Sequence, residues 1–202
     1  IFLAILFNWN TPLAPIQLLW LNLVTDGAPA LALGTEKGDP DIMEYPPRPS
    51  DEPIINRFMV KGIIVQTIAI TAVTLAAFYL GGGALKSATA EARILSETFA
   101  FVTLSLSELF RAYTARSEYF PLTKIGIFSS KNMNLAVLVS VILVLMVVYT
   151  PFLQEVFDTV TLHWNDWAEI LPLVVVPSIA AEVMKSISYK QHLKEREARS
   201  KA

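Results

Sequence analysis

The stretch PIQLLWLNLVTDGAPALALG, residues 15–34, is long and apolar enough to cross a bilayer as a helix, yet it carries a carboxylate at its centre. Asp26 lies there with Asn22 and Thr25, at spacings of three and four residues that place the three side chains on one face of a helix. A charged side chain at the bilayer centre costs about 3 kcal/mol on insertion scales, so an intramembrane Asp indicates a function.

Two residues that weaken a helix, Gly27 and Pro29, follow Asp26 at once. A break in a membrane helix frees backbone carbonyl oxygens. Together with oxygen-bearing side chains, these carbonyls suit a hard cation that has lost its water. We therefore interpret this stretch as an intramembrane cation site.

The composition predicts an all-α membrane protein. The chain is 53% hydrophobic with a mean hydropathy of +0.49, and it has no cysteine, which excludes disulfides and thiolate metal sites. Continuous apolar runs satisfy their backbone in lipid only as helices. We predict a helical bundle of five complete transmembrane helices plus the end of a sixth at the N-terminus. The complete spans lie near Ile16–Leu33, Met59–Leu80, Ile94–Tyr113, Leu135–Phe152 and Trp167–Tyr189, and the partial one is Ile1–Phe7.

The basic residues predict the orientation of these spans. All but two of the 16 Lys and Arg residues fall on one side of the predicted membrane, and the exceptions are Lys86 and Arg93. By the positive-inside rule, the loop 35–57 and the C-terminal tail 190–202 are cytoplasmic and the loop 151–166 lies outside. The chain also opens on apolar residues without an initiator Met, which suggests part of a longer polypeptide.

The stretch at 15–34, with the following DPDIMEYPPR at 39–48, resembles the sixth transmembrane helix and next cytoplasmic loop of P-type calcium pumps. These pumps include the sarco/endoplasmic reticulum calcium ATPase and its bacterial counterparts. The later segments match helices seven to ten in order, loop length and a few polar positions. Residues 1–202 therefore resemble the C-terminal part of the pump's membrane domain, from the end of helix five to helix ten.

The resemblance implies a set of calcium ligands. In the family the sixth-helix Asn, Thr and Asp ligate calcium, and they correspond to Asn22, Thr25 and Asp26. The stretch LSELFRAY places Glu108 where the reticulum-type pumps carry a helix-eight Glu. The ligands of the family's fourth and fifth helices are not in this sequence.

The resemblance also implies partners and a location. Calcium is the transported ion, while ATP and magnesium act in cytoplasmic domains that this sequence lacks, so the chain does not hydrolyse ATP by itself. Its expected partners are the lipid bilayer and the remaining N-terminal portion of the pump, and no nucleic acid. The expected location is a bacterial plasma membrane, which the chain crosses several times.

Three of the four candidate ligands also have a simpler interpretation. Asn22 can hydrogen-bond between helices, and Thr25 can bond a carbonyl of its own helix. Glu108 can pair with Arg111, three residues later on the same helix.

Two further alternatives remain open. The loop carboxylates Asp39, Asp41 and Glu44 resemble the part of the pump loop that touches the phosphorylation domain, but they also fit a solvated acidic loop. The whole chain could instead be a membrane binding or structural module, or a secondary transporter with a broken-helix cation site.

Overall fold

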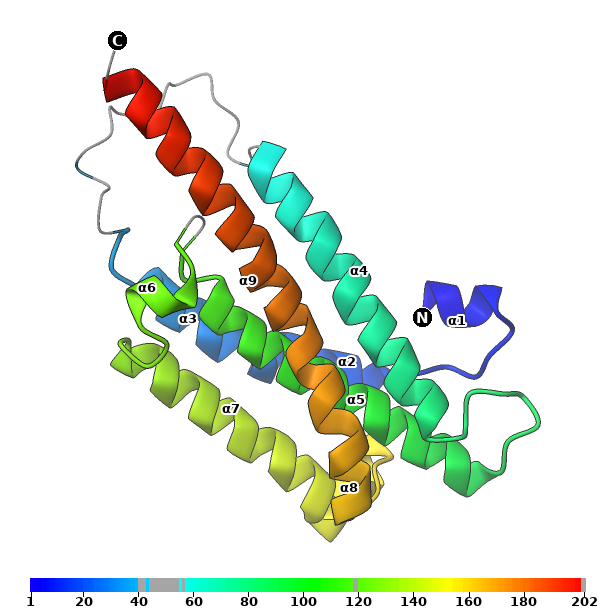
Figure 1. Cartoon of the computed structure of the whole chain (residues 1–202). Helices are drawn as coiled ribbons and strands as arrows, with labels where there is room; N and C mark the ends of the chain where they lie inside the picture. Colours follow the sequence, from blue (N-terminus) through cyan, green and yellow to red (C-terminus); the bar gives the residue numbers. More distant parts are fainter. Residues whose placement is uncertain (40–42, 44–54, 56, 118–119, 201–202) are drawn as a thin grey trace.

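The computed structural model describes residues 1–39, 43, 55, 57–117 and 120–200, and its regular elements there are all helical (Figure 1). The elements are α1 (Phe2–Leu6), α2 (Pro15–Trp20), the π-helical turn η1 (Leu21–Thr25), α3 (Gly27–Gly34), α4 (Arg57–Leu80), α5 (Ala90–Thr114), α6 (Leu122–Ile125), α7 (Lys131–Tyr149), α8 (Pro151–Phe157) and α9 (Trp164–Ser200).

The predicted helical membrane fold is confirmed. In the described part of the chain, four helical segments are long and apolar enough to cross a membrane: Pro15–Gly34, Met59–Leu80, Lys131–Tyr149 and Trp164–Ile187. The remaining predicted span forms as α5, which is long enough at 25 residues but more polar than these four. The partial span forms as the short helix α1.

Helix α5 is polar because it lies at the centre of the bundle. It packs against α4, α7 and α9, and also against α3 and η1. Its Phe99 and Phe101 are buried in one core with Phe78 of α4, Val147 of α7 and Ile170 of α9. The helix also buries six Ser and Thr residues. Small residues of this kind allow close approach between membrane helices, and α5 is accordingly buried among the other helices over much of its length.

The connections gather at two opposite ends of the bundle. At one of them, called here the α6 end, α3 and α5 finish and α7 begins (Figure 1). Arg116 Nη2 donates to Glu36 Oε1 at 2.9 Å, and Asn132 Nδ2 donates to Thr35 Oγ1 at 2.9 Å. These bonds join the segment after α3 to the connection between α5 and α7.

At the opposite end, called here the α8 end, the loop before α2 is tied to the connection between α4 and α5. The Asn10 amide donates to the carbonyls of Gly83 and Leu85, at 2.8 Å in both cases. The N–H of Gly83 donates to Ser96 Oγ at 2.6 Å. This network fixes α4 and α5 as a close antiparallel pair.

We predict that Gly83→Ala destabilises the protein by about 1–3 kcal/mol, since overpacking at a rigid contact costs this much. A Cβ at residue 83 would lie 2.3 Å from the Ala92 carbonyl oxygen and 2.5 Å from Arg93 Cα, and backbone atoms cannot swing aside. Thermal unfolding in detergent measures the loss. Gly34→Ala is the control, because a Cβ there meets nothing within 4 Å, and an unchanged melting temperature for Gly83→Ala would contradict the contact.

The last predicted span, Trp167–Tyr189, corresponds to the apolar segment Trp164–Ile187 of α9, and the helix continues past it to Ser200, because the charged residues after 189 lower hydropathy without breaking a helix. Most of the loop 35–57 lies outside the described residues, and Asp41 and Glu44 are among the undescribed positions.

Candidate cation-binding site

The first membrane span changes its helical hydrogen bonding in the middle. The N–H of Asp26 donates to the carbonyl of Leu21 at 3.1 Å, five residues back, which makes Leu21–Thr25 a π-helical turn. Such turns are rare and occur frequently at functional sites. The helix was expected to break at Gly27 and Pro29, but its irregular hydrogen bonding lies just before them, at Leu21–Thr25. These two residues form the first turn of α3, where the missing N–H of proline is tolerated.

The π turn alters the surroundings of two carbonyl oxygens. Pro29 has no N–H, so the Thr25 carbonyl lacks the donor that an α-helix would place four residues later. The preceding carbonyl, of Val24, accepts from Ser140 Oγ of α7 at 3.0 Å. Sequence reasoning missed Ser140. A lone hydroxyl in the otherwise apolar centre of α7 was the available signal.

The three candidate side chains of this span do not share one environment. Thr25 is buried, at 1% exposure, and its hydroxyl donates to the Leu21 carbonyl at 2.6 Å. Asn22 and Asp26 are exposed. The wider π turn aligns residues four apart better than residues three apart. Asn22 and Asp26 therefore keep a common face, while Thr25 turns into the bundle.

The fourth candidate, Glu108, lies on α5, which packs directly against η1 and α3. Its side chain is 20% exposed, and its Oε2 accepts from Arg111 Nε at 2.6 Å. The structure therefore contains the ion pair between Glu108 and Arg111 that their i, i+3 spacing suggested. The charges of Glu108 and Arg111 both act on Asp26, so the fold brings two carboxylates that are distant in sequence into one region.

The oxygen atoms gathered here suit a hard cation but do not complete its coordination shell. Among the described residues, no three His, Cys, Asp or Glu side chains cluster to hold a metal. The site instead offers two carboxylates, an amide, a hydroxyl and backbone carbonyls. Calcium takes six to eight oxygen ligands, which is more than these side chains offer on their own.

A membrane bundle that interrupts one helix beside carboxylates from two helices is typical of the membrane domain of an ion transporter. The comparisons specify the class further. The chain belongs to the family of P-type cation-transporting ATPases, since its residues 10–187 match "Cation transporting ATPase, C-terminus".

Relatives from bacteria and animals agree. The chain is 34% identical to "Calcium-transporting ATPase 1" of Bacillus cereus over 92% of its own length and 22% of the relative. It is equally 34% identical to "Calcium-transporting ATPase type 2C member 1" of Homo sapiens, over 92% of its length and 20% of the relative. It therefore spans about a fifth of the curated relatives that it matches, and within them it corresponds to a membrane part of a cation pump.

Proposed function

We propose that this chain is the membrane half-domain of an ATP-driven calcium pump and that Asn22, Thr25, Asp26 and Glu108 contribute ligands to its transport site. The observation that carries the proposal is the π turn, which keeps Asn22 and Asp26 on one face of the first span, with Asp26 close enough to Glu108 of α5 to be affected by its charge. The printed names of the relatives support calcium as the ion. The remaining ligands, and the domains that use ATP and magnesium, belong to the other parts of the pump.

The chemistry of each group fits this role. The Thr25 hydroxyl gives its hydrogen to the Leu21 carbonyl, which leaves oxygen lone pairs available to a cation. Glu108 can bind the ion only when its carboxylate releases Arg111. The guanidinium therefore competes with calcium for this carboxylate. Flexible oxygen ligands of this kind suit calcium better than magnesium, which demands a smaller octahedral cage and keeps its waters.

Calcium uptake by the intact protein that contains this chain tests the proposal. We expect ATP-driven calcium accumulation in sealed vesicles, and we expect Glu108→Gln to raise the half-saturating calcium concentration about tenfold, or about 1.4 kcal/mol. The amide keeps one oxygen ligand but loses the charge. Glu97→Gln, on the same helix toward the α8 end, is the matched control and leaves the affinity unchanged.

Three outcomes would count against the proposal. Uptake driven by an ion gradient without ATP would indicate a secondary transporter. Accumulation of another cation in place of calcium would overturn the assignment of the ion. An unchanged calcium affinity in Glu108→Gln would leave Glu108 with Arg111 as its only partner.

We further propose that the α6 end, the loop 35–57 and the tail 190–202 all face the cytoplasm. The exposed Lys124 lies at the α6 end and the exposed Lys86 lies near the α8 end. In a cysteine-free background, a cysteine at residue 86 should react with a membrane-impermeant thiol reagent added to intact cells, and one at residue 124 only after the membrane is opened. The reverse labelling pattern would invert the orientation.

A further inference from the structure

Helix α7 carries one polar side chain in the middle of its membrane span, and that side chain contacts the candidate cation site. Ser140 is the central residue of this 19-residue helix and is fully buried, and every other residue from Leu135 to Val148 is apolar. The helix packs against α3 and η1. The carbonyl that accepts from Ser140 Oγ at 3.0 Å is that of Val24, within the π turn. The hydroxyl therefore reaches the first span where its helix is irregular.

The hydroxyl of Ser140 bonds another helix rather than its own. A hydroxyl buried in apolar surroundings needs a partner, and a Ser or Thr inside a helix often finds one in the carbonyl four residues back. Thr98 and Ser105 of α5 do so, at 2.8 and 2.7 Å. Ser140 donates across to the π turn instead, so its hydrogen bond joins α7 to the first span.

This bond fixes one peptide plane within the π turn. The Val24 carbonyl and the Thr25 N–H belong to the same rigid peptide unit, so a restraint on the carbonyl oxygen also restrains the Thr25 backbone. The Thr25 carbonyl has no N–H four residues later, because that residue is Pro29. Asp26 follows directly. Helix α7 thus restrains the backbone from which Asp26 projects, at a place where the helix has lost part of its own hydrogen bonding.

We propose that Ser140 is a positioning residue of the transport site, whose hydroxyl holds the π turn in the shape that keeps Asn22 and Asp26 on one face. This role rests on the proposed function, in which these two side chains are calcium ligands. Ligands that are already held in place bind an ion more tightly, because less conformational freedom is lost on binding. Ser140 acts through the backbone of the first span and not as a ligand.

The test is Ser140→Ala in the intact protein that contains this chain, with ATP-driven calcium uptake into sealed vesicles as the readout. The half-saturating calcium concentration should rise about three- to fivefold, as expected for the loss of one hydrogen bond between helices. The rate at saturating calcium should stay unchanged, because the variant weakens binding and alters no group that reacts. A loss of folded protein would instead lower the maximal rate.

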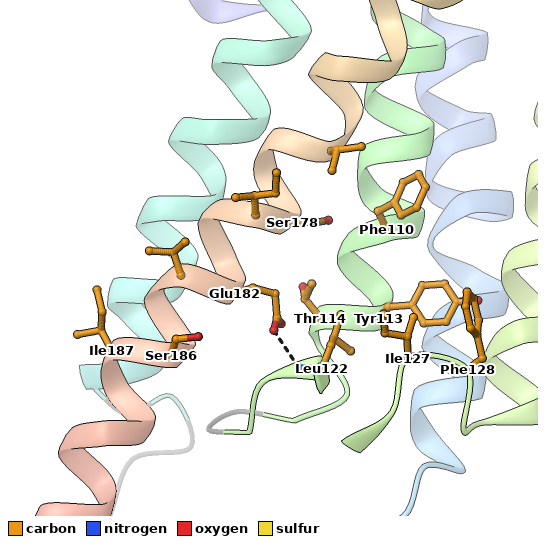
Figure 2. A pocket seen from close by; sticks show the side chains of 13 residues that line it. Phe110, Tyr113, Thr114, Leu122, Ile127, Phe128, Ser178, Glu182, Ser186 and Ile187 are labelled. Carbon is orange, nitrogen blue, oxygen red and sulfur yellow. Dashed lines mark hydrogen bonds between the residues drawn. The ribbon is translucent and has the colours of Figure 1, made fainter. Parts of the chain in front are cut away.

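Two variants that each remove a buried hydroxyl elsewhere serve as controls. Thr159→Val is the matched one, because Thr159 Oγ1 donates to the Val147 carbonyl of the same helix α7, at 2.9 Å, but at the α8 end. Ser178→Ala is the second, because the Ser178 hydroxyl has no hydrogen-bond partner among the described residues. Ser178 lines the groove between α5, α9 and the α6 connection that Figure 2 shows. Both variants should keep the calcium affinity of the wild type.

A further variant keeps the role testable if Ser140→Ala folds poorly. Ser140→Cys nearly conserves the size of the side chain, but its S–H is a weak donor, so it should raise the half-saturating concentration by a smaller factor. An unchanged concentration in Ser140→Ala, or an equal rise in Thr159→Val, would overturn the role of Ser140 alone, provided that Asp26→Asn still weakens calcium binding. Wild-type affinity in Asp26→Asn would overturn the proposed function and the role of Ser140 with it.

Discussion

Asp26→Asn should reduce calcium-dependent phosphorylation of the intact pump by ATP about a hundredfold or more, equivalent to about 2.7 kcal/mol in calcium binding. Asp26 is the carboxylate directly after the π turn, on the same face as Asn22 and near Glu108. Asparagine keeps the shape but removes the charge, and calcium affinity depends strongly on the number of charged ligands. The exposed position of Asp26 within this chain means that its packing hardly changes.

A folding measurement provides the control for this variant. The unfolding temperature of Asp26→Asn in detergent, measured without calcium, should match that of the wild type, because Asp26 is exposed within this chain. A lower unfolding temperature together with lost phosphorylation would indicate misfolding. Ordinary calcium activation of the variant would show that Asp26 is not a ligand.

The second large effect is expected at Arg116, whose side chain is only 3% exposed. Its Nη1 donates to the carbonyls of Gly126 and Ile127, both at 2.9 Å, and its Nη2 donates to Glu36 Oε1 at 2.9 Å and Ser129 Oγ at 2.7 Å. Arg116→Leu leaves a largely buried carboxylate and two carbonyls without their donor. Breaking one side of such a pair costs about 3–5 kcal/mol, so we expect a loss of stability of this size.

Thermal unfolding in detergent measures this loss, with Lys131→Leu as the control. Lys131 is a basic residue at the same end of the bundle but is exposed, so its replacement should change stability by less than about 0.5 kcal/mol. A similar melting temperature for Arg116→Leu and wild type would show that the hydrogen bonds of Arg116 do not hold the α6 end together.

The same pair predicts a dependence on pH. The hydrogen bond from Arg116 holds the pKa of Glu36 below its ordinary value of 4.5. A carboxylate whose pKa is lower in the folded state stabilises the fold above the ordinary pKa, and this contribution is lost as the pH falls through the folded value. Wild type should therefore lose more stability below pH 4.5 than Glu36→Gln.

The sequence predicted the spans well because hydropathy reports contact with lipid. The runs near 59–80 and 135–152 face lipid over part of their surface, so their composition marks them clearly. The run at 94–113 was identified despite its charges, but its central position was not predictable. Burial among other helices depends on partners that are distant in sequence. Hydropathy located the apolar part of α9 but could not locate the end of the helix, since hydropathy falls at the charged tail and a helix need not end there.

The sequence suggested the residues of the candidate site, which stay a prediction, but it did not suggest their geometry. The spacing of Asn22 and Asp26 identified the polar face, and the i, i+3 relation of Glu108 and Arg111 indicated their pairing. The π turn has no such signature, because the same residues can form an α-helix. Packing of η1 against α5 and α7, including the bond from Ser140 to Val24, favours the wider turn. The burial of Thr25 follows from that choice.

The π turn also limits which insertions and deletions this part of the chain can tolerate. A π turn contains one residue more than the α-helical turn that it replaces. Deleting one residue of Leu21–Thr25 would therefore restore a regular α-helical turn and leave α2 and α3 in nearly their present orientation. A deletion within α2, between Gln17 and Trp20, would instead rotate the earlier part of the helix by about 100° and move Gln17 away from the Phe157 carbonyl, to which it donates at 2.9 Å. The loss of a single codon is thus easier to accommodate within the π turn than in the regular helix before it.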